Sequence, residues 1–181
     1  MIDELLDEAT VKMDGAVAHT AQEFATVRTG RANPGLLSRI TVDYYGTQTP
    51  LQQIAGFSVP EARMLIVQPY DKSAIQAIER AISTADLGLN PSNDGNIIRL
   101  AFPALTEERR RDLIRVVRQL AEDGRVAIRN VRRHTKDEIE SLGISEDEVR
   151  RAEKHLQDLT DEHVARLDEL LAHKEEELLE V

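Results

Sequence analysis

The stretch that decides the fold runs from residue 105 to residue 148 and reads LTEERRRDLIRVVRQLAEDGRVAIRNVRRHTKDEIESLGISEDE. Its apolar side chains recur with the period of an amphipathic helix, and they are Leu113, Val117, Leu120, Ile128, Val131, Ile139 and Leu142. Thr106 is the predicted N-cap of this helix, and Gly143 ends it. Ser145 and Glu148 have the spacing of a capping box, which predicts that another helix begins directly after a tight turn.

Two further stretches have the same period and predict two more long helices. The first extends from about Ile2 to about Arg28, with apolar side chains at Leu5, Leu6, Ala9, Met13, Val17, Phe24 and Val27. The last follows the capping box, with apolar side chains at Val149, Ala152, Leu156, Leu159, Leu167, Leu170 and Leu178. Because no helix can bury its own stripe, we expect an elongated antiparallel three-helix bundle.

Residues 30–104 have a different composition, since they hold all six prolines and all three tyrosines. Such a composition is typical of short strands and turns. Alternating residues over 40–44 predict a strand that turns at Gly46. Residues 64–68 and 97–102 predict two more strands.

A short helix is expected between the second and third of these strands. Asp71 or Ser73 can cap it, and Ser73 with Gln76 has the spacing of a capping box. Gly88 and Pro91 are predicted to end this helix. Its apolar stripe consists of Ile75, Ile78, Ala81 and Ile82. The fold class is therefore α+β, with a small domain of strands and one covering helix inserted into the bundle.

The domain boundaries follow from these elements. Residues 1–29 and 105–181 are assigned to the bundle, and residues 30–104 to the inserted domain. Two short connections would join the domains and allow a hinge motion, which glycine permits and proline directs. The residues expected to form this hinge are Gly30, Arg31, Ala32, Asn33, Pro34, Pro103, Ala104 and Leu105.

Composition excludes several classes of protein. The 181 residues include no cysteine, which excludes disulfides, thiol catalysis and thiolate metal sites. No apolar run is long enough to span a membrane, and the acidic start of the chain lacks the features of a signal peptide. We therefore expect a cytoplasmic protein without a membrane partner.

The net charge of −10 hides an asymmetry along the chain. Residues 105–135 carry nine arginines, no lysine and five acidic side chains, whereas residues 136–181 carry six basic and sixteen acidic side chains. At about 100 degrees per residue, several arginines lie in an arc of roughly 100 degrees opposite the apolar stripe. We call this set the arginine stripe: Arg111, Arg115, Arg118, Arg125, Arg129 and Arg132.

The arginine stripe has two interpretations. Guanidinium groups bind phosphate bidentately and stack on bases, which favours a contact with nucleic acid. An ordinary solvated helix face, combined with a genomic preference for arginine codons, would give the same pattern. Tyr44, Tyr45 and Phe57 could likewise stack on bases or pack within the inserted domain.

The sequence lacks the motifs of catalysis and cofactor binding. It has no P-loop, no nucleophile elbow and no dinucleotide-binding glycine motif. The histidines lack the spacing of metal ligands, and they are His19, His134, His155, His163 and His173. No catalytic residue, metal site or cofactor is therefore expected.

Six blocks of the sequence resemble, in order, those of the bacterial ribosome recycling factor family. They are VRTGRANP at 27–34, VDYYG at 42–46 with TPL at 49–51, VPEAR at 59–63, DLGLNP at 86–91 with DG at 94–95, LTEERR at 105–110 and VAIRNVRR at 126–133. The resemblance covers nearly the whole chain. It implies an L-shaped molecule in which a three-helix bundle carries an inserted β/α/β domain.

The resemblance also implies a function. Members of this family bind the 50S ribosomal subunit against 23S rRNA, and with elongation factor G and GTP they split the post-termination ribosome. They are not enzymes, and we expect a monomer without a cofactor, because the elongation factor uses the GTP. The residues that match the family's rRNA contact are Arg129, Arg132 and Arg133. Further candidates for this contact are Arg111, Arg118, Arg125, Arg28 and Arg31.

Three features of the sequence depart from the family pattern. Tyr70 stands where the family often has tryptophan, His134 and Thr135 replace an acidic residue and alanine, and the turn from Leu142 to Ser145 is several residues short.

Two other classes of function remain open. A coiled-coil scaffold could bind a protein through the acidic last helix and would not co-sediment with ribosomes, and an enzyme is the third class.

Overall fold

The computed structural model describes residues 1–180, which fold into two compact units. The first unit contains Met1–Arg28 and the chain from Thr106 onward, and we call it the bundle. The second contains Thr29–Leu105, and we call it the inserted unit. Thr29 and Leu105, which the sequence analysis assigned to the bundle, group with the inserted unit.

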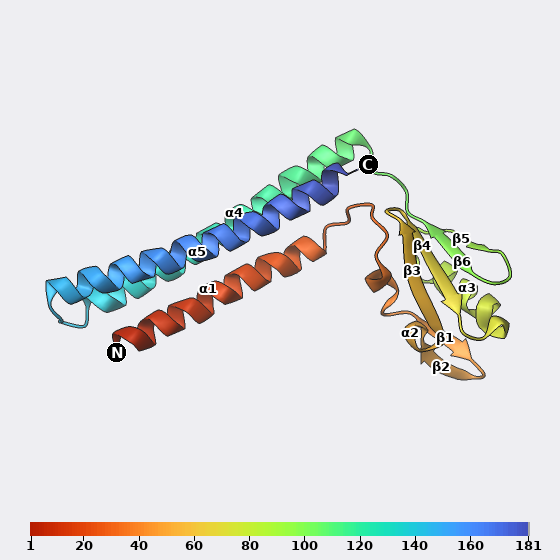
Figure 1. Ribbon diagram of the computed structural model, residues 1–181, viewed down its shortest axis with the longest axis horizontal. Helices are drawn as coiled ribbons and strands as arrows, with labels where there is room; N and C mark the ends of the chain where they lie inside the picture. Colours follow the sequence, from red (N-terminus) through yellow and green to blue (C-terminus); the bar gives the residue numbers. More distant parts are fainter. Residues whose placement is uncertain (181) are drawn as a thin grey trace. The chain divides into compact units, whose positions relative to one another are not determined.

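Three long helices form the bundle: α1 (Ile2–Ala25), α4 (Glu107–Glu140) and α5 (Glu146–Leu179). Each helix contacts the other two, and α4 runs antiparallel to both α1 and α5 (Figure 1). The predicted α+β fold, with long helices and a small sheet-containing insertion, is confirmed.

Local capping fixes the helix ends. The Thr106 hydroxyl accepts a hydrogen bond from the Arg109 amide at 3.1 Å, and Ser145 and Glu148 form the predicted capping box. The first helix ends at Ala25, three residues before the predicted end, because the amide of Thr26 bonds the carbonyl of Glu23 and tightens the last turn. Arg28 therefore lies outside α1.

The bundle core is mainly apolar, and the three helices approach one another closely around Gly124. The largest side chains buried here are Met13, Ile128, Ile139, Leu156 and Leu167. A methyl group added at Gly124 would overlap both Thr20 of α1 and Leu167 of α5. Glycine therefore lets three helices approach closely at one level, despite its low helix propensity.

A polar cluster joins α1 to α5 inside the bundle. His163 is only 2% exposed, and its Nε2 lies 2.9 Å from Asp14 Oδ1 while its Nδ1 lies 2.6 Å from the Leu159 carbonyl. The ring of His163 therefore links α5 to the Asp14 carboxylate of α1. Hydrogen bonds from Arg166 and from His163 lower the pKa of Asp14.

The inserted unit begins with the short 3-10 helix η1 (Pro34–Leu37) and the hairpin of β1 (Thr41–Tyr44) and β2 (Thr47–Pro50). Tyr45 and Gly46 connect these strands with φ of 50° and 79°. Positive φ at both residues is the geometry of a type I′ turn, and the predicted turn at Gly46 is confirmed.

A second, four-stranded antiparallel sheet follows, with the order β3-β4-β6-β5. Its strands are β3 (Ala55–Glu61), β4 (Met64–Pro69), β5 (Pro91–Asn93) and β6 (Ile98–Ala101). The residue pattern predicts β1, β4 and β6 but not β2, β3, β5 or the single-turn helix α2 (Leu51–Ile54). These unanticipated elements lack a clear alternation of apolar and polar residues.

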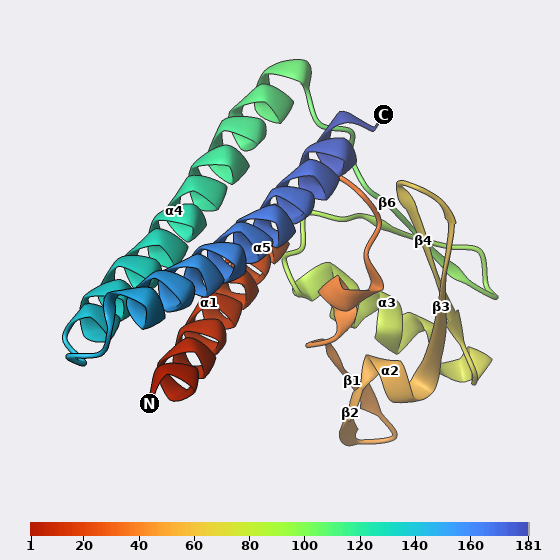
Figure 2. The ribbon, with the colours of Figure 1, turned by 60° about the vertical axis from the view of Figure 1, so that its left-hand side comes forward.

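The helix of the inserted unit, α3 (Ile75–Thr84), contacts β1 and β5 (Figure 2). A 3-10 turn, η2 (Lys72–Ala74), precedes it. Asp71 caps this turn by accepting a hydrogen bond from the Ser73 amide at 3.0 Å. The predicted capping box of Ser73 and Gln76 is wrong, because the Ser73 hydroxyl donates to Asp71 instead.

The inserted unit has a core of its own. Side chains from its strands and helices are fully buried, among them Leu37, Val42, Leu51, Leu65, Val67, Ile78, Ile98 and Leu100. Each unit therefore has the apolar interior that an independently folding domain requires.

Candidate nucleic-acid interface

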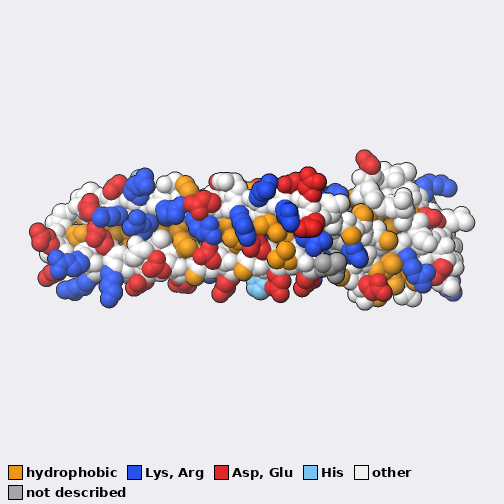
Figure 3. All heavy atoms as spheres, turned by 90° about the horizontal axis from the view of Figure 1, so that it is seen from above, with side chains coloured by type: hydrophobic (Ala, Val, Ile, Leu, Met, Phe, Trp, Pro, Cys, Tyr) orange, Lys and Arg blue, Asp and Glu red, His pale blue; other side chains and the backbone are white. Residues whose placement is uncertain are grey.

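The arginine stripe follows the solvent-facing side of α4. Seen over the bundle, basic side chains alternate with acidic ones along the helices and gather toward the end where α4 and α5 are joined (Figure 3). The acidic side chains of α5 therefore compete with any external anion for the arginines of α4.

Two arginines of the stripe are paired with α5 at heptad spacing. Arg118 Nε lies 2.6 Å from Glu175 Oε1, and Arg125 Nη2 lies 2.7 Å from Asp168 Oδ1. Seven residues separate both the arginines and their partners, as expected for facing positions on packed antiparallel helices. The hydrogen bonds that Arg125 donates to Asp168 and to Glu122 raise the pKa of this arginine, which is 24% exposed. We call these two pairs the ion-pair ladder.

The ladder stops at the next heptad position. Arg132 donates to the amide oxygen of Gln157 at 3.3 Å, and Gln157 donates in turn to Asp161 at 2.8 Å. A neutral side chain thus stands between Arg132 and the carboxylate that would continue the ladder. The positive charge of Arg132 is not neutralised there.

The other stripe arginines form short-range pairs on α4 itself. Arg111 contacts Glu107, Arg115 lies 3.4 Å from Asp112, and Arg129 lies 2.5 Å from Glu122. The hydrogen bond from Arg129, followed by that from Arg125, lowers the pKa of Glu122. Such exposed pairs contribute little to stability, so a phosphate can replace the carboxylate at small cost.

The remaining arginine candidates differ from one another. Arg133 is exposed and makes no hydrogen bond or ion pair within residues 1–180. Arg28 is exposed just beyond the end of α1, and Arg31 is half-buried in the inserted unit. Arg132 and Arg133 are therefore adjacent candidates on α4 that have no carboxylate partner among residues 1–180, a property that they share with Arg28.

The two connections are tied to the same turn of the inserted unit. The amide of Ala32 donates to the Ala62 carbonyl at 2.7 Å, and the amide of Phe102 donates to the Arg63 carbonyl at 2.8 Å. Gly30 has a φ of +76°, and a Cβ there would lie 3.3 Å from the Leu105 side chain.

These contacts divide the eight hinge candidates into two groups. Ala32 is hydrogen-bonded to the sheet turn, Asn33 caps η1 through the Gly35 amide at 2.9 Å, and Pro34 begins η1. All three are parts of the folded inserted unit. The hinge candidates that remain are those on the bundle side of Ala32 and Phe102, namely Gly30, Arg31, Pro103, Ala104 and Leu105.

The aromatic candidates pack within the inserted unit. The Tyr44 and Tyr45 rings meet edge to face at a centroid distance of 4.5 Å, and both hydroxyls donate to Asp71 Oδ2 at 3.1 Å. Phe57 packs partly buried against the core. Desolvation and the hydrogen bond to Asp71 raise the pKa of Tyr44. Tyr45 nevertheless remains 78% exposed.

No group of three or more metal-ligating side chains lies together within residues 1–180. Over the same residues, no helix is both long enough and apolar enough to cross a membrane.

Comparison with known proteins assigns this architecture to a class, the translation factors. A family model described as Ribosome recycling factor matches residues 20–179. The chain belongs to the ribosome recycling factor family, and the resemblance found in the sequence is confirmed.

Relatives with curated names agree over their full length. The ribosome-recycling factors of Acidothermus cellulolyticus and Thermobifida fusca are 56% and 57% identical, each with 100% of both chains aligned. A solution structure of the ribosome recycling factor is 44% identical, with a TM-score of 0.77, and the match covers 99% of this chain and 98% of that one.

A second solved structure of a relative also includes a partner protein. It presents models for the T. thermophilus ribosome recycling factor and the E. coli elongation factor G bound to the E. coli post-termination complex. Its chain is 48% identical to this one, with a TM-score of 0.65, and the match covers 99% of this chain and 100% of that one.

Two features of this surface were not predicted from the sequence. Arg118 and Arg125 share a spacing of seven residues with Asp168 and Glu175, but the sequence does not show which carboxylates of α5 face these arginines. Arg150 and Lys154 of α5 lie in one groove with Arg132, but the net acidic charge of the last helix concealed them.

Proposed function

We propose that this protein binds the post-termination ribosome and, together with elongation factor G and GTP, separates the subunits for another round of translation. The observation that carries this proposal is the 48% identical relative, described in a post-termination complex with elongation factor G, because the match extends over 99% of the chain. The protein would act as a monomer in the cytoplasm, where bacterial ribosomes work.

In this proposal the bundle binds the 50S subunit against 23S rRNA. Arg132 and Arg133 make the first contacts, because neither is neutralised by a carboxylate, and Arg129 can exchange Glu122 for a phosphate. Arg111, Arg118 and Arg125 would exchange their carboxylates in the same way, and Arg28 and Arg31 would add contacts near the connections.

The protein would carry out no catalysis and hold no cofactor in this role. Elongation factor G would bind and hydrolyse the GTP, and the chain would transmit force by moving the inserted unit about its two connections. Gly30, Arg31, Pro103, Ala104 and Leu105 are the proposed hinge, because the residues beyond them are tied to the sheet.

The proposal is tested with purified post-termination ribosomes, and subunit splitting is followed by light scattering. Splitting should require this protein, elongation factor G and GTP together, and omission of any one should abolish it. Splitting without elongation factor G, or no co-sedimentation with 50S subunits, would refute the proposal and favour a scaffold that binds proteins.

The contact surface is tested separately by the dependence of 50S binding on salt. Binding through phosphates should weaken steeply between low and moderate salt, because each neutralised phosphate releases counterions. Arg132→Glu should bind far more weakly than the parent. Flat salt dependence, or parental affinity in this variant, would show that the ribosome is bound through another surface.

A further inference from the structure

We propose that a groove between α4 and α5, near the turn that joins them, is a binding site for RNA backbone phosphates. Arg150 and Lys154 of α5 would share this site with Arg132 of α4. The inference rests on the proposed function for its RNA partner, but it adds contacts from a second helix that neither the arginine stripe nor the family comparison assigns.

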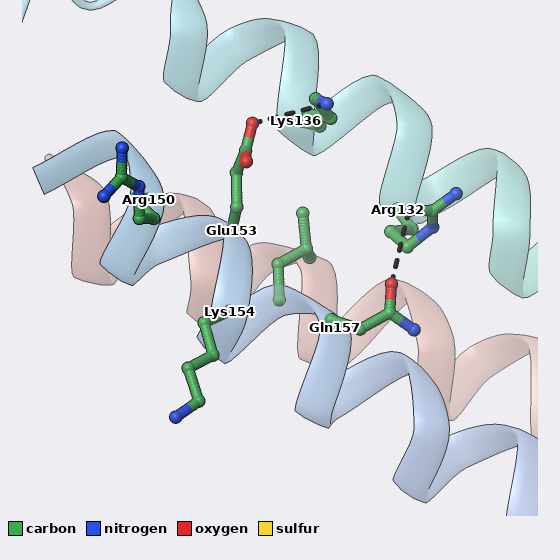
Figure 4. Close-up of a pocket in the computed structure, with 7 residues that line it drawn as sticks. Arg132, Lys136, Arg150, Glu153, Lys154 and Gln157 are labelled. Atoms are coloured by element: carbon green, nitrogen blue, oxygen red, sulfur yellow. Dashed lines mark hydrogen bonds and ion pairs between the residues drawn. The ribbon is translucent and has the colours of Figure 1, made fainter. Parts of the chain in front are cut away.

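The groove is a defined feature of the bundle surface. It has a volume of about 290 Å³ and is bounded by both helices (Figure 4). Its lining side chains are Arg132, Lys136, Arg150, Glu153, Lys154, Leu156 and Gln157. Four of these carry positive charge and one carries negative charge.

The single carboxylate of the groove is already engaged. Glu153 lies 3.4 Å from Lys136 Nζ, and Glu140 lies 3.5 Å from the same nitrogen. The hydrogen bond that Lys136 donates to Glu153 is the chief cause of the raised pKa of this lysine. Lys136 and Glu153 therefore cancel each other, and the other three cations determine the charge of the groove.

None of those three cations has a carboxylate partner within the described chain. Arg132 bonds only the neutral amide of Gln157, while Arg150 and Lys154 are exposed and form no ion pair. In the ion-pair ladder, by contrast, Arg118 and Arg125 are each held by a carboxylate of α5. The same two helices thus neutralise both cations of the ladder but only one of the four cations that line the groove.

The chemistry of the groove favours phosphate over bases. Arg150 and Lys154 are one helical turn apart, about 6 Å along the axis, so they can contact separate phosphates. No aromatic side chain lines the groove, so bases have no surface for stacking. Contacts of this kind position a protein on RNA without reading its sequence.

The test compares two double variants of the full chain with equal changes in net charge. Arg150→Gln with Lys154→Gln removes two groove cations. Arg151→Gln with Lys12→Gln removes two exposed cations that do not line the groove. Circular dichroism would verify that both variants keep the helical bundle, since all four side chains lie on the surface.

Binding would be measured with two probes, 50S subunits and a single-stranded poly(U) oligonucleotide, over a salt series. Two lost phosphate contacts should reduce the slope of log K against log salt by about 1.4 with poly(U), at about 0.7 per contact for a single strand, and by a similar amount with 50S subunits. The groove variant should show this loss with both probes, and the Arg151/Lys12 variant should retain the parental slope.

Three results would overturn the proposal. They are a parental slope in the groove variant, an equal loss in both variants, and tighter binding of the parent to polyglutamate than to poly(U), which would assign the groove to an acidic protein segment. If the parent bound poly(U) through the groove but did not bind 50S subunits, the proposed function would fail and the phosphate site would stand.

Discussion

The bundle and the inserted unit bury their cores in different ways. The bundle is made of three continuous helices, and its backbone hydrogen bonds are local to each helix. The inserted unit is made of elements no longer than ten residues, and its sheet pairs β4 with β6 across about thirty intervening residues. Long amphipathic helices can be predicted from the period of their apolar residues, whereas short strands depend on partners that are distant in the chain.

Because the two units have separate apolar cores, we predict that they unfold separately. Each unit has its own spectroscopic signal. All three tyrosines lie in the inserted unit, and there is no tryptophan. Tyrosine fluorescence therefore reports on the inserted unit alone, and circular dichroism at 222 nm reports mainly on the long helices.

The largest effect is expected from Leu65→Ala in the inserted unit. Leu65 is fully buried, and such truncations cost about 2–5 kcal/mol through lost burial and the cavity left behind. The tyrosine transition should shift by this amount in urea, while the transition at 222 nm keeps its midpoint. A joint shift of both transitions would show that the two units unfold as one.

A smaller effect is expected from Gly124→Ala in the bundle. Overlap with Thr20 and Leu167 should cost about 1–3 kcal/mol, offset by up to about 1 kcal/mol of helix propensity. Gly15→Ala is the matched control, because a Cβ there meets nothing within 4 Å. It should stabilise the bundle slightly. Equal effects of the two variants on the transition at 222 nm would contradict the close approach at Gly124.

A pH-dependent effect is expected from the cluster of Asp14, His163 and Arg166. Because the pKa of Asp14 is lowered in the folded bundle, its contribution is present above the pKa of the unfolded carboxyl, about 3.9. It is lost as the pH falls through the folded pKa. Asp14→Asn should therefore reduce the loss of bundle stability at acid pH, measured as the free energy of unfolding from the transition at 222 nm. The transition followed by tyrosine fluorescence should not change. An unchanged loss of stability at acid pH would mean that other carboxylates determine it.

The smallest effect on stability, with a large effect on function, is expected from Ala104→Pro in the second connection. Two consecutive prolines stiffen the chain, and both unfolding transitions should stay within about 0.5 kcal/mol of the parent. Binding to 50S subunits should persist while splitting slows. Ala104→Ser is the control, and normal splitting by the proline variant would remove the hinge from the mechanism.

The periodicity of the sequence predicted the bundle well because each helix satisfies its own backbone. Thr106, Ser145 and Gly143 marked ends that agree with the structure to within a few residues. The same reasoning missed β2, β3 and β5, whose residues become strands only through pairing. It also predicted a capping box with Ser73, although the Ser73 hydroxyl donates its hydrogen bond to Asp71.

The candidate interface divides in a similar way. The helical projection placed the arginines together because all of them lie on one helix. It could not tell which would be neutralised, since Glu175 and Asp168 are 57 and 43 residues away from their partners. Only the packing of α5 on α4 distinguishes the paired Arg118 and Arg125 from Arg132.

By itself, the sequence determined the α+β class, the three amphipathic helices, the inserted segment and the family. These properties are encoded in local periods, caps and blocks of residues. The tertiary structure alone decided that Gly124 lies at the meeting point of three helices, that His163 is buried against Asp14, and that Arg132 shares a groove with Arg150 and Lys154. Each of these depends on which residues of separate helices meet at the same level, and a period within one helix carries no information about that register.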